Sequence, residues 1–357
     1  INQLSGAGCD HMGNFPTLPI AGALRVSPDS ILNMQTPVGK EIGTAGYYAA
    51  TVDHSIRAEL TVTERTGMAR YTFSSKEKQG TVIIGGGVAA TSIQVAAIKI
   101  TGPHSCEGYA EGGAFCGIPT PYKVYFVAEF DADAESFGTW KEERLHANHT
   151  FAEGSHSGVY FTFPLKEGNQ AVQYKIGVSY VSVENARENL RVENPAWDFS
   201  AVRQATQDKW NEYLGKIEVE GDNEDRQMQF YTHLYRSLIH PNVCSDVNGE
   251  YMGADSQVHK TARKFYTSFS NWDTYRTQTA LIAMLAPEET SDIVMSHYLF
   301  AEQSGGGFPR WVLANIETGV MQGDPTPILV ANAYAFGARN YDPRTADYAL
   351  WSRSAGG

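Results

Sequence analysis

The sequence predicts a chain that is mostly β in its first half, as an antiparallel β-sandwich, and mostly α in its second half. Three observations support this prediction: short apolar and aromatic runs before residue 185, helical spacing after it, and a length of 357 residues, enough for two domains of roughly 150 residues. We therefore predict a sandwich domain over 1–185, a helical linker over 186–221 and a helical domain over 222–357.

The predicted strands are short runs rich in β-branched and aromatic residues, bounded by Gly, Pro, Asp and Asn. This pattern is typical of an antiparallel sandwich. The runs are 46–49, 56–62, 69–73, 81–84, 124–127, 158–163 and 174–180.

Helical spacing begins after 194–197 and continues to about residue 214, which predicts the helical linker. Longer periodic runs with polar or glycine-rich breaks follow, as expected for packed helix pairs. These runs are 228–239, 272–285, 289–302 and 327–338. The last run lies close to Gly357, so we expect the helical domain to be incomplete and the chain to be part of a longer polypeptide.

The charge balance excludes one class of partner. Lys and Arg number 28 and Asp and Glu 40, which gives a net charge of −12. This charge repels phosphate backbones and anionic lipid, so nucleic acid is not an expected partner. No window approaches the roughly 18 consecutive apolar residues of a membrane span, and none is predicted.

Four cysteines are present, and two of them lie in the segment SCEGYAEGGAFC. We interpret this segment as a glycine-rich loop in which Cys106 and Cys116 form a short disulfide. Two reduced thiols are the alternative, and Cys9 and Cys244 have no assigned partner. Zinc is not expected, because paired Cys-x-x-Cys or Cys/His clusters are absent from the sequence.

The first candidate site is the N-terminal segment GAGCDHMGNFP, in which Asp10, His11 and Asn14 lie on a glycine-rich backbone. Calcium takes six to eight oxygen ligands from carboxylates and carbonyls, which a loop of this kind offers. An ordinary turn is the alternative. Phosphate-loop and dinucleotide signatures do not occur, since Gly85-Gly86-Gly87 lacks the required spacing and following helix. The Gly-x-Ser-x-Gly and His-Glu-x-x-His motifs are absent from the sequence as well.

The second candidate is Asn271-Trp272-Asp273-Thr274-Tyr275-Arg276. A sugar site needs an apolar ring against C–H groups and charged groups that hydrogen-bond hydroxyls, and Trp272, Asp273 and Arg276 offer both. In the alternative interpretation, Asp273 caps a helix and pairs with Arg276 at helical spacing.

The third candidate is the segment GGGFPRW, which contains Trp311 and is followed by Glu317 and Asp324. Three consecutive glycines allow a loop to approach a ligand or another element closely. Two carboxylates can serve as acid and base, but the sequence does not give their separation. Helix capping is the alternative for Asp324.

Together these segments resemble glycoside hydrolase family 92, calcium-dependent exo-acting α-mannosidases. The resemblance rests on GAGCDHMGNFP, YKIGVSYVSVENARENL, FYTHLYRSLIHPNV, NWDTYRT, GGGFPRW and IETGVMQGD, in the family's order from residue 6 to about 340. It implies an N-terminal β-sandwich, a helical linker and the start of an (α/α)6 catalytic barrel. It also implies a secreted enzyme that uses Ca²⁺ and hydrolyses α-mannosides by acid/base catalysis, with inversion of configuration at the anomeric carbon.

The resemblance also implies roles for individual residues. Cys9 and Asp10 are expected near calcium, and Asp10 and His11 near the substrate. Trp272, Asp273 and Arg276 are expected to hold the terminal mannose, with Trp311 and Glu317 as further pocket residues.

The sequence departs from the family in one respect. The family's general acid, general base and most calcium ligands lie in segments C-terminal to the matched region, so they are expected beyond Gly357. If the 357 residues were the whole protein, we would expect no mannosidase activity. The alternatives are another sugar hydrolase or phosphorylase of the same architecture, and a non-catalytic carbohydrate-binding protein. The sequence does not show which α-mannosidic linkage is preferred, or whether the substrate carries a phosphate group.

Overall fold

The computed structural model describes residues 9, 11–29, 36–167 and 170–344, and the chain divides into two compact units. The first contains Ile1–Phe115 and Lys123–Asp208, and the second contains Cys116–Tyr122 and Lys209–Gly357. The domain limits drawn from the sequence at 185 and 221 stay predictions.

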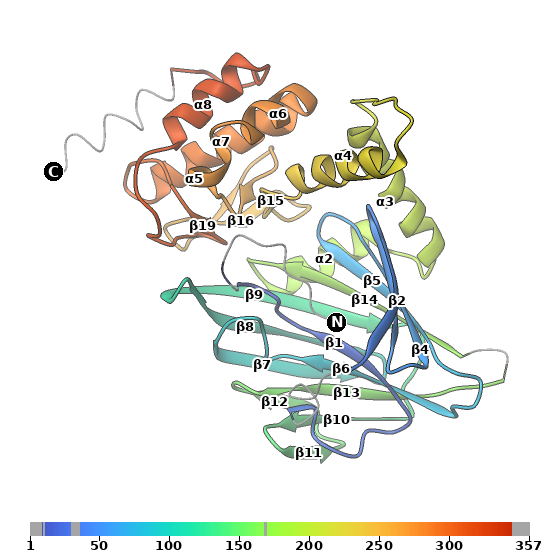
Figure 1. Cartoon of the computed structure of the whole chain (residues 1–357). Coiled ribbons are helices and arrows are strands. Elements are labelled where there is room, and N and C mark those ends of the chain that lie inside the picture. Colours follow the sequence, from blue (N-terminus) through green and yellow to red (C-terminus); the bar gives the residue numbers. More distant parts are fainter. Residues whose placement is uncertain (1–8, 10, 30–35, 168–169, 345–357) are drawn as a thin grey trace. The chain divides into compact units, whose positions relative to one another are not determined.

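The first unit is a sandwich of two antiparallel sheets, which confirms the predicted fold (Figure 1). One sheet has five strands in the order β1-β6-β13-β10-β11, and the other has nine in the order β12-β7-β8-β9-β14-β5-β4-β3-β2. The strands are β1 Thr17–Ala21, β2 Val38–Thr44, β3 Tyr47–Val52, β4 Ile56–Val62, β5 Thr66–Thr72, β6 Gln79–Gly85, β7 Ile93–Gly102, β8 Ser105–Phe115, β9 Ile118–Phe130, β10 Ser136–Lys141, β11 Arg144–Ala147, β12 Phe151–Glu153, β13 Ser157–Pro164 and β14 Ala171–Ser179.

Alternation of buried and exposed residues along the strands builds the core of the sandwich. Phe130 of β9 is a centre of this core, with ring centroids 5.0 Å from Phe161, 4.9 Å from Phe163 and 5.3 Å from Tyr174. Each large apolar side chain buried in this way stabilises the fold by roughly 1.5–3 kcal/mol. Each of the seven predicted strand runs overlaps one of these strands.

The segment predicted as a glycine-rich loop is instead strand β8, and its glycines explain the error. A Cβ on Gly108 would lie 2.2 Å from the carbonyl oxygen of Ala97 in β7. A Cβ on Gly112 would lie 2.6 Å from the carbonyl oxygen of Ser92, the residue before β7. Glycine is therefore needed here because the neighbouring backbone comes close, and not because the chain turns.

The predicted Cys106–Cys116 disulfide is wrong. Neither Cys106 nor Cys244, which are both buried, is in a disulfide, whereas Cys9 and Cys116 are disulfide-bonded. Cys106 lies at the start of the 11-residue strand β8 and Cys116 follows its end. An extended chain rises roughly 3.3 Å per residue, whereas a disulfide requires Cα atoms within roughly 7 Å.

Helix α2 (Val183–Glu193) packs on β14 of the sandwich. Ser182 caps its first turn by accepting a hydrogen bond from the backbone N–H of Asn185 at 3.0 Å. A Cβ on Gly177 of β14 would lie 2.3 Å from the carbonyl oxygen of Ala186, so glycine lets the helix lie directly on the strand. The predicted strand 174–180 thus corresponds to β14, which ends at Ser179, and α2 begins at Val183.

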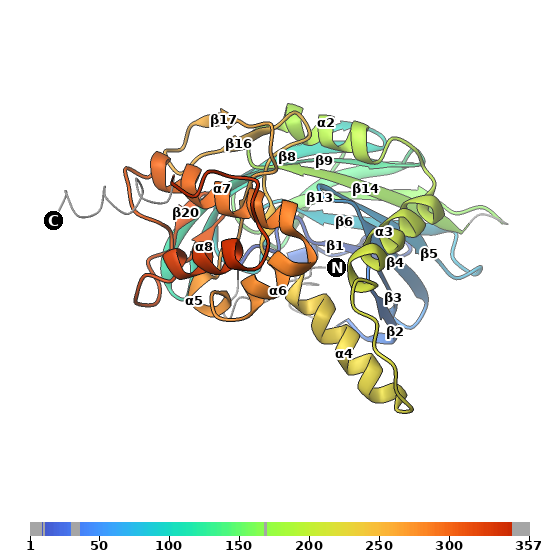
Figure 2. The same cartoon turned by 90° about the horizontal axis from the view of Figure 1, so that it is seen from above.

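Helix α3 (Phe199–Leu214) follows, and the second unit consists of helices joined by short hairpins. In this unit α6, α7 and α8 contact one another (Figure 2). The elements are α4 Glu224–Ser237, β15 Asn242–Val243, β16 Glu250–Met252, β17 Val258–Lys260, β18 Tyr266–Thr267, α5 Asn271–Thr274, α6 Gln278–Leu285, α7 Pro287–Gln303, β19 Val312–Leu313, β20 Ile316–Glu317 and α8 Thr326–Ala335.

The predicted helix 272–285 is two helices, because the chain leaves α5 after Thr274 and re-enters a helix at Gln278. The other three periodic runs match α4, α7 and α8. Within the described part of the chain, no helix is long and apolar enough to cross a membrane.

Candidate active site

The single-turn helix α5 exposes the residues predicted to hold the sugar. Trp272 is 43% exposed, and Asp273 and Arg276 are also exposed. The carboxylate of Asp273 accepts a hydrogen bond from the hydroxyl of Ser270 at 2.5 Å, so it bonds a side chain and does not cap backbone N–H groups. Asp273 and its neighbour Trp272 are therefore both accessible to solvent.

Arg276 does not pair with Asp273 in the described structure. Its Nε donates to the hydroxyl of Tyr275 at 2.9 Å, and its guanidinium lies 5.3 Å from the centre of the same ring. This contact raises the pKa of Arg276, so the side chain stays charged. The predicted helical pairing is absent because α5 ends at Thr274, and helical spacing does not extend to residue 276.

Trp311 and Glu317 belong to the β19–β20 hairpin beside α5. Trp311 forms an antiparallel bridge with Ser270 and is only 4% exposed, so its ring belongs to the interior. The Glu317 carboxylate accepts hydrogen bonds from the backbone N–H groups of Arg310 at 2.7 Å, Trp311 at 3.2 Å and Gly319 at 3.2 Å. These bonds hold the turn, whereas a sugar contact by either residue stays a prediction.

We expect Glu317→Ala to lower the free energy of unfolding by about 2 kcal/mol, because three N–H groups lose a charged acceptor. Glu317→Gln keeps one carbonyl oxygen and should recover about half of that loss. Urea unfolding of the two variants measures the effect. Equal stability of Glu317→Ala and the unchanged protein would refute the conclusion that the Glu317 carboxylate stabilises the turn.

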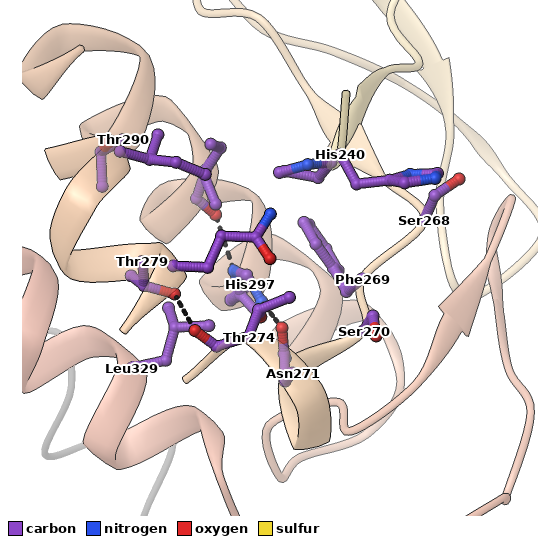
Figure 3. Close-up of a pocket in the computed structure, with 14 residues that line it drawn as sticks. His240, Ser268, Phe269, Ser270, Asn271, Thr274, Thr279, Thr290, His297 and Leu329 are labelled. Atoms are coloured by element: carbon purple, nitrogen blue, oxygen red, sulfur yellow. Dashed lines mark hydrogen bonds between the residues drawn. The ribbon is translucent and has the colours of Figure 1, made fainter. Parts of the chain in front are cut away.

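A buried network lies beneath α5 (Figure 3). The Asn271 amide nitrogen donates to the carbonyl oxygen of Pro309 at 2.9 Å and to the hydroxyl of Thr326 at 2.8 Å. Its amide oxygen lies 3.1 Å from Nε2 of His297, and its backbone N–H donates to the carbonyl of Arg310 at 3.1 Å. Asn271 is 1% exposed, so the first residue of α5 is anchored in the interior while the next two face solvent.

His297 of α7 is fully buried and stacks on Phe269, with ring centroids 3.8 Å apart. Its Nδ1 lies 2.7 Å from the carbonyl oxygen of Ile293, and a neutral imidazole can donate its one N–H either to this oxygen or to Asn271. Burial lowers the pKa of His297 to about 4, so the ring is neutral near pH 7. The sequence motif predicted neither His297 nor the buried role of Asn271.

A cavity of about 30 Å³ lies against this network, lined by residues that include His240, Ser268, Asn271, Thr279 and Leu329 (Figure 3). This volume holds about two water molecules, whereas sites for organic ligands usually occupy roughly 300–1,000 Å³. A hexose does not fit. The predicted sugar-binding residues Trp272 and Asp273 lie in the exposed part of α5, and Asn271, which lines this cavity, is buried.

The N-terminal candidate residues belong to the other unit. His11 is 4% exposed, its Nδ1 lies 2.8 Å from the carbonyl oxygen of Cys9, and its ring meets Phe115 edge to face at 5.8 Å. Asp10 lies outside the described residues. Over the ranges that the structure describes, no group of three His, Cys, Asp or Glu side chains could hold a metal, and the sulfur of Cys9 is in a disulfide. The expected contact of Cys9 and Asp10 with calcium stays a prediction.

Two family models match the chain. The glycosyl hydrolase family 92 N-terminal domain matches residues 1–179, and the glycosyl hydrolase family 92 catalytic domain matches residues 185–355. Both matches follow the order of the two structural units.

Solved structures show the same fold. A family GH92 α-mannosidase from Bacteroides thetaiotaomicron, in complex with mannoimidazole, is 24% identical with a TM-score of 0.88, covering 98% of this chain and 47% of that one. A family GH92 inverting mannosidase from the same organism is 25% identical with a TM-score of 0.84, covering 96% and 46%. An uncharacterized secreted glycosidase from Arthroderma benhamiae is 26% identical over 304 residues, 76% of this chain and 37% of that protein.

The chain thus spans less than half the length of these relatives. Its two family matches together cover nearly all of its residues, and they confirm the resemblance seen in the sequence. The chain belongs to glycosyl hydrolase family 92, with its N-terminal domain and part of its catalytic domain.

Proposed function

We propose that the protein containing this chain hydrolyses terminal α-linked mannose from glycans, with inversion of configuration and with the assistance of Ca²⁺. Family membership carries the proposal. The exposed Trp272 beside Asp273 supports it, because an indole face and a carboxylate are the groups that bind the C–H and hydroxyl faces of a sugar. In the proposed site Arg276 adds a permanent positive charge.

The acid and base are proposed to come from segments that follow this region in the family. An inverting site places its two carboxyl groups about 6.5–9.5 Å apart, with a water molecule between the base and the sugar. Glu317 is not proposed for either role, since backbone N–H groups engage its carboxylate. The part played by this chain is therefore to bind and orient the sugar.

Calcium is proposed to be held mainly by ligands outside the described residues. When bound, a divalent cation supplies oxygen coordination and positive charge to sugar hydroxyls. The described side chains do not supply three ligands, and so no step of the reaction is assigned to them through the metal.

We further propose that the second unit is the start of an (α/α)6 barrel. Large apolar side chains on α6 and α8 are exposed, including Met284 at 56%, Ile328 at 49% and Tyr334 at 42%. Helices with apolar residues on every side are normally buried among other helices. Further helices of the barrel would cover these faces.

Secretion is proposed on two grounds. Cys9 and Cys116 are disulfide-bonded, and structural disulfides persist in oxidising compartments. The relative from Arthroderma benhamiae is described as secreted. The expected partners are neutral α-mannoside glycans, in keeping with the net charge of −12.

The test is to incubate the full-length protein with an α-linked mannobiose and follow the products by NMR. We expect free mannose whose first-formed anomer is β, as inversion of an α-mannoside requires. A chelator should abolish turnover and added calcium should restore it. An α-anomer as first product would refute inversion, and unchanged turnover in excess chelator would refute the metal requirement. No release of mannose from any of a set of differently linked α-mannobioses would refute the substrate.

A further inference from the structure

We propose that Asn271 and His297 are positioning residues, which hold the α5 turn so that Trp272 and Asp273 meet the terminal sugar in a fixed orientation. The inference rests on the proposed function, since it concerns how the same sugar site is built. Neither side chain reaches the sugar, because both are buried.

The first step of the argument is that α5 has little stability of its own. It contains four residues, and its N-cap Ser270 makes no side-chain capping hydrogen bond. Isolated helices shorter than about 12 residues are marginal in water even with favourable sequences. Its position must therefore be set by contacts with the rest of the second unit.

The second step is that these contacts include hydrogen bonds from side chains of the interior. Asn271 joins the start of α5 to Pro309 and Thr326, which lie in two other segments. At the other end, the amide nitrogen of Asn332 in α8 donates to the carbonyl oxygen of Tyr275 at 2.7 Å. The turn is thus held at both ends by side-chain amides.

The third step concerns His297, which fixes the amide of Asn271. Its ring is held between Phe269 and the carbonyl of Ile293, and its Nε2 lies 3.1 Å from the Asn271 amide oxygen. The cavity of about 30 Å³ borders both side chains, so the turn is not fully supported by close packing from below. Directional hydrogen bonds then help to set its orientation.

The expected consequence is a loss of substrate binding when the network is cut. Bound substrates tolerate little misplacement, and a shift of about 1 Å costs up to about 100-fold in rate. Because the network acts on the residues that grip the sugar, we expect it to affect KM more than kcat.

The experiment compares variants of the full-length protein on one α-mannoside. Asn271→Leu should raise KM about tenfold with kcat within about twofold, and His297→Leu should raise KM by a smaller factor, because Asn271 keeps its bonds to Pro309 and Thr326. The double variant should be no worse than Asn271→Leu alone, because His297 acts through Asn271. His297→Gln, whose amide can still donate to Asn271, should recover most of the loss. Thr290→Val is the matched control, because Thr290 of α7 is buried and lines the same cavity, and the hydrogen bond described for its hydroxyl goes to the carbonyl oxygen of Ala286.

The outcomes separate the two proposals when Trp272→Ala and Asp273→Ala are measured in the same assay. If these two raise KM and the Leu variants do not, the sugar site stands and the positioning role is overturned. If Trp272→Ala and Asp273→Ala leave KM unchanged, the sugar site itself is wrong, and the positioning role falls with it. A fall in kcat alone, matched by Thr290→Val, would show a merely structural effect.

Discussion

Asp273→Ala is expected to lower kcat/KM for an α-mannoside by up to about 100-fold while the melting temperature stays almost unchanged. A hydrogen bond from a hydroxyl to a charged acceptor is worth roughly 1.5–3 kcal/mol, and each 1.4 kcal/mol is tenfold in rate. The carboxylate of Asp273 is exposed, and the one bond described for it comes from Ser270. Its removal should therefore change stability by no more than about 0.5 kcal/mol.

Steady-state kinetics and thermal unfolding of the full-length protein check this prediction. Asp273→Asn keeps an acceptor without the charge and should be intermediate. Glu302→Ala removes an exposed carboxylate from α7 of the same unit and serves as the matched control. A large fall in melting temperature with unchanged kcat/KM would instead show that Asp273 serves the turn alone.

Acid is expected to destabilise the protein through His297 by about 3 kcal/mol between pH 7 and pH 4. Burial lowers the pKa of His297 from its ordinary value of 6.5 to about 4. Between these two values the unfolded chain binds a proton that the folded chain does not, so the free energy of unfolding falls as the pH drops below 6.5. A shift of about 2.5 pH units corresponds to about 3 kcal/mol.

Other groups titrate in the same pH range. The contribution of His297 is therefore measured as the difference in unfolding free energy between the unchanged protein and a variant that lacks this histidine. Urea unfolding of the unchanged protein and of His297→Gln should be compared from pH 7 to pH 4. The other nine of the ten histidines are shared, and their contributions cancel. The unchanged protein should lose about 3 kcal/mol relative to the variant. Parallel curves would show that His297 accepts a proton in the folded state as easily as in the unfolded one.

The fold was largely predictable because its main signals are local. Short β-rich runs became strands, and periodic runs such as 289–302 became helices, since alternation and helical spacing report directly which side of an element is buried. The exceptions are informative. The glycines of β8 resemble a loop in sequence, and only the approach of β7 shows why they lie in a strand.

The candidate site was predictable in its exposed part and not in its support. Trp272 and Asp273 form a recognisable pair because adjacent residues on one turn stay together whatever the rest of the chain does. Glu317 looked like a candidate pocket residue, but its carboxylate bonds backbone N–H groups that the sequence cannot place near it.

The sequence by itself determined the β-then-α order, the family and the exposed Trp272–Asp273 pair, because these depend on local spacing and on residue identity. The tertiary structure decided which cysteines are disulfide-bonded, that Trp311 is buried, and that Asn271 meets His297 across 26 positions of the chain. Those features depend on long-range contacts. They form only when packing brings distant segments together, and no local pattern of residues encodes the distance between them.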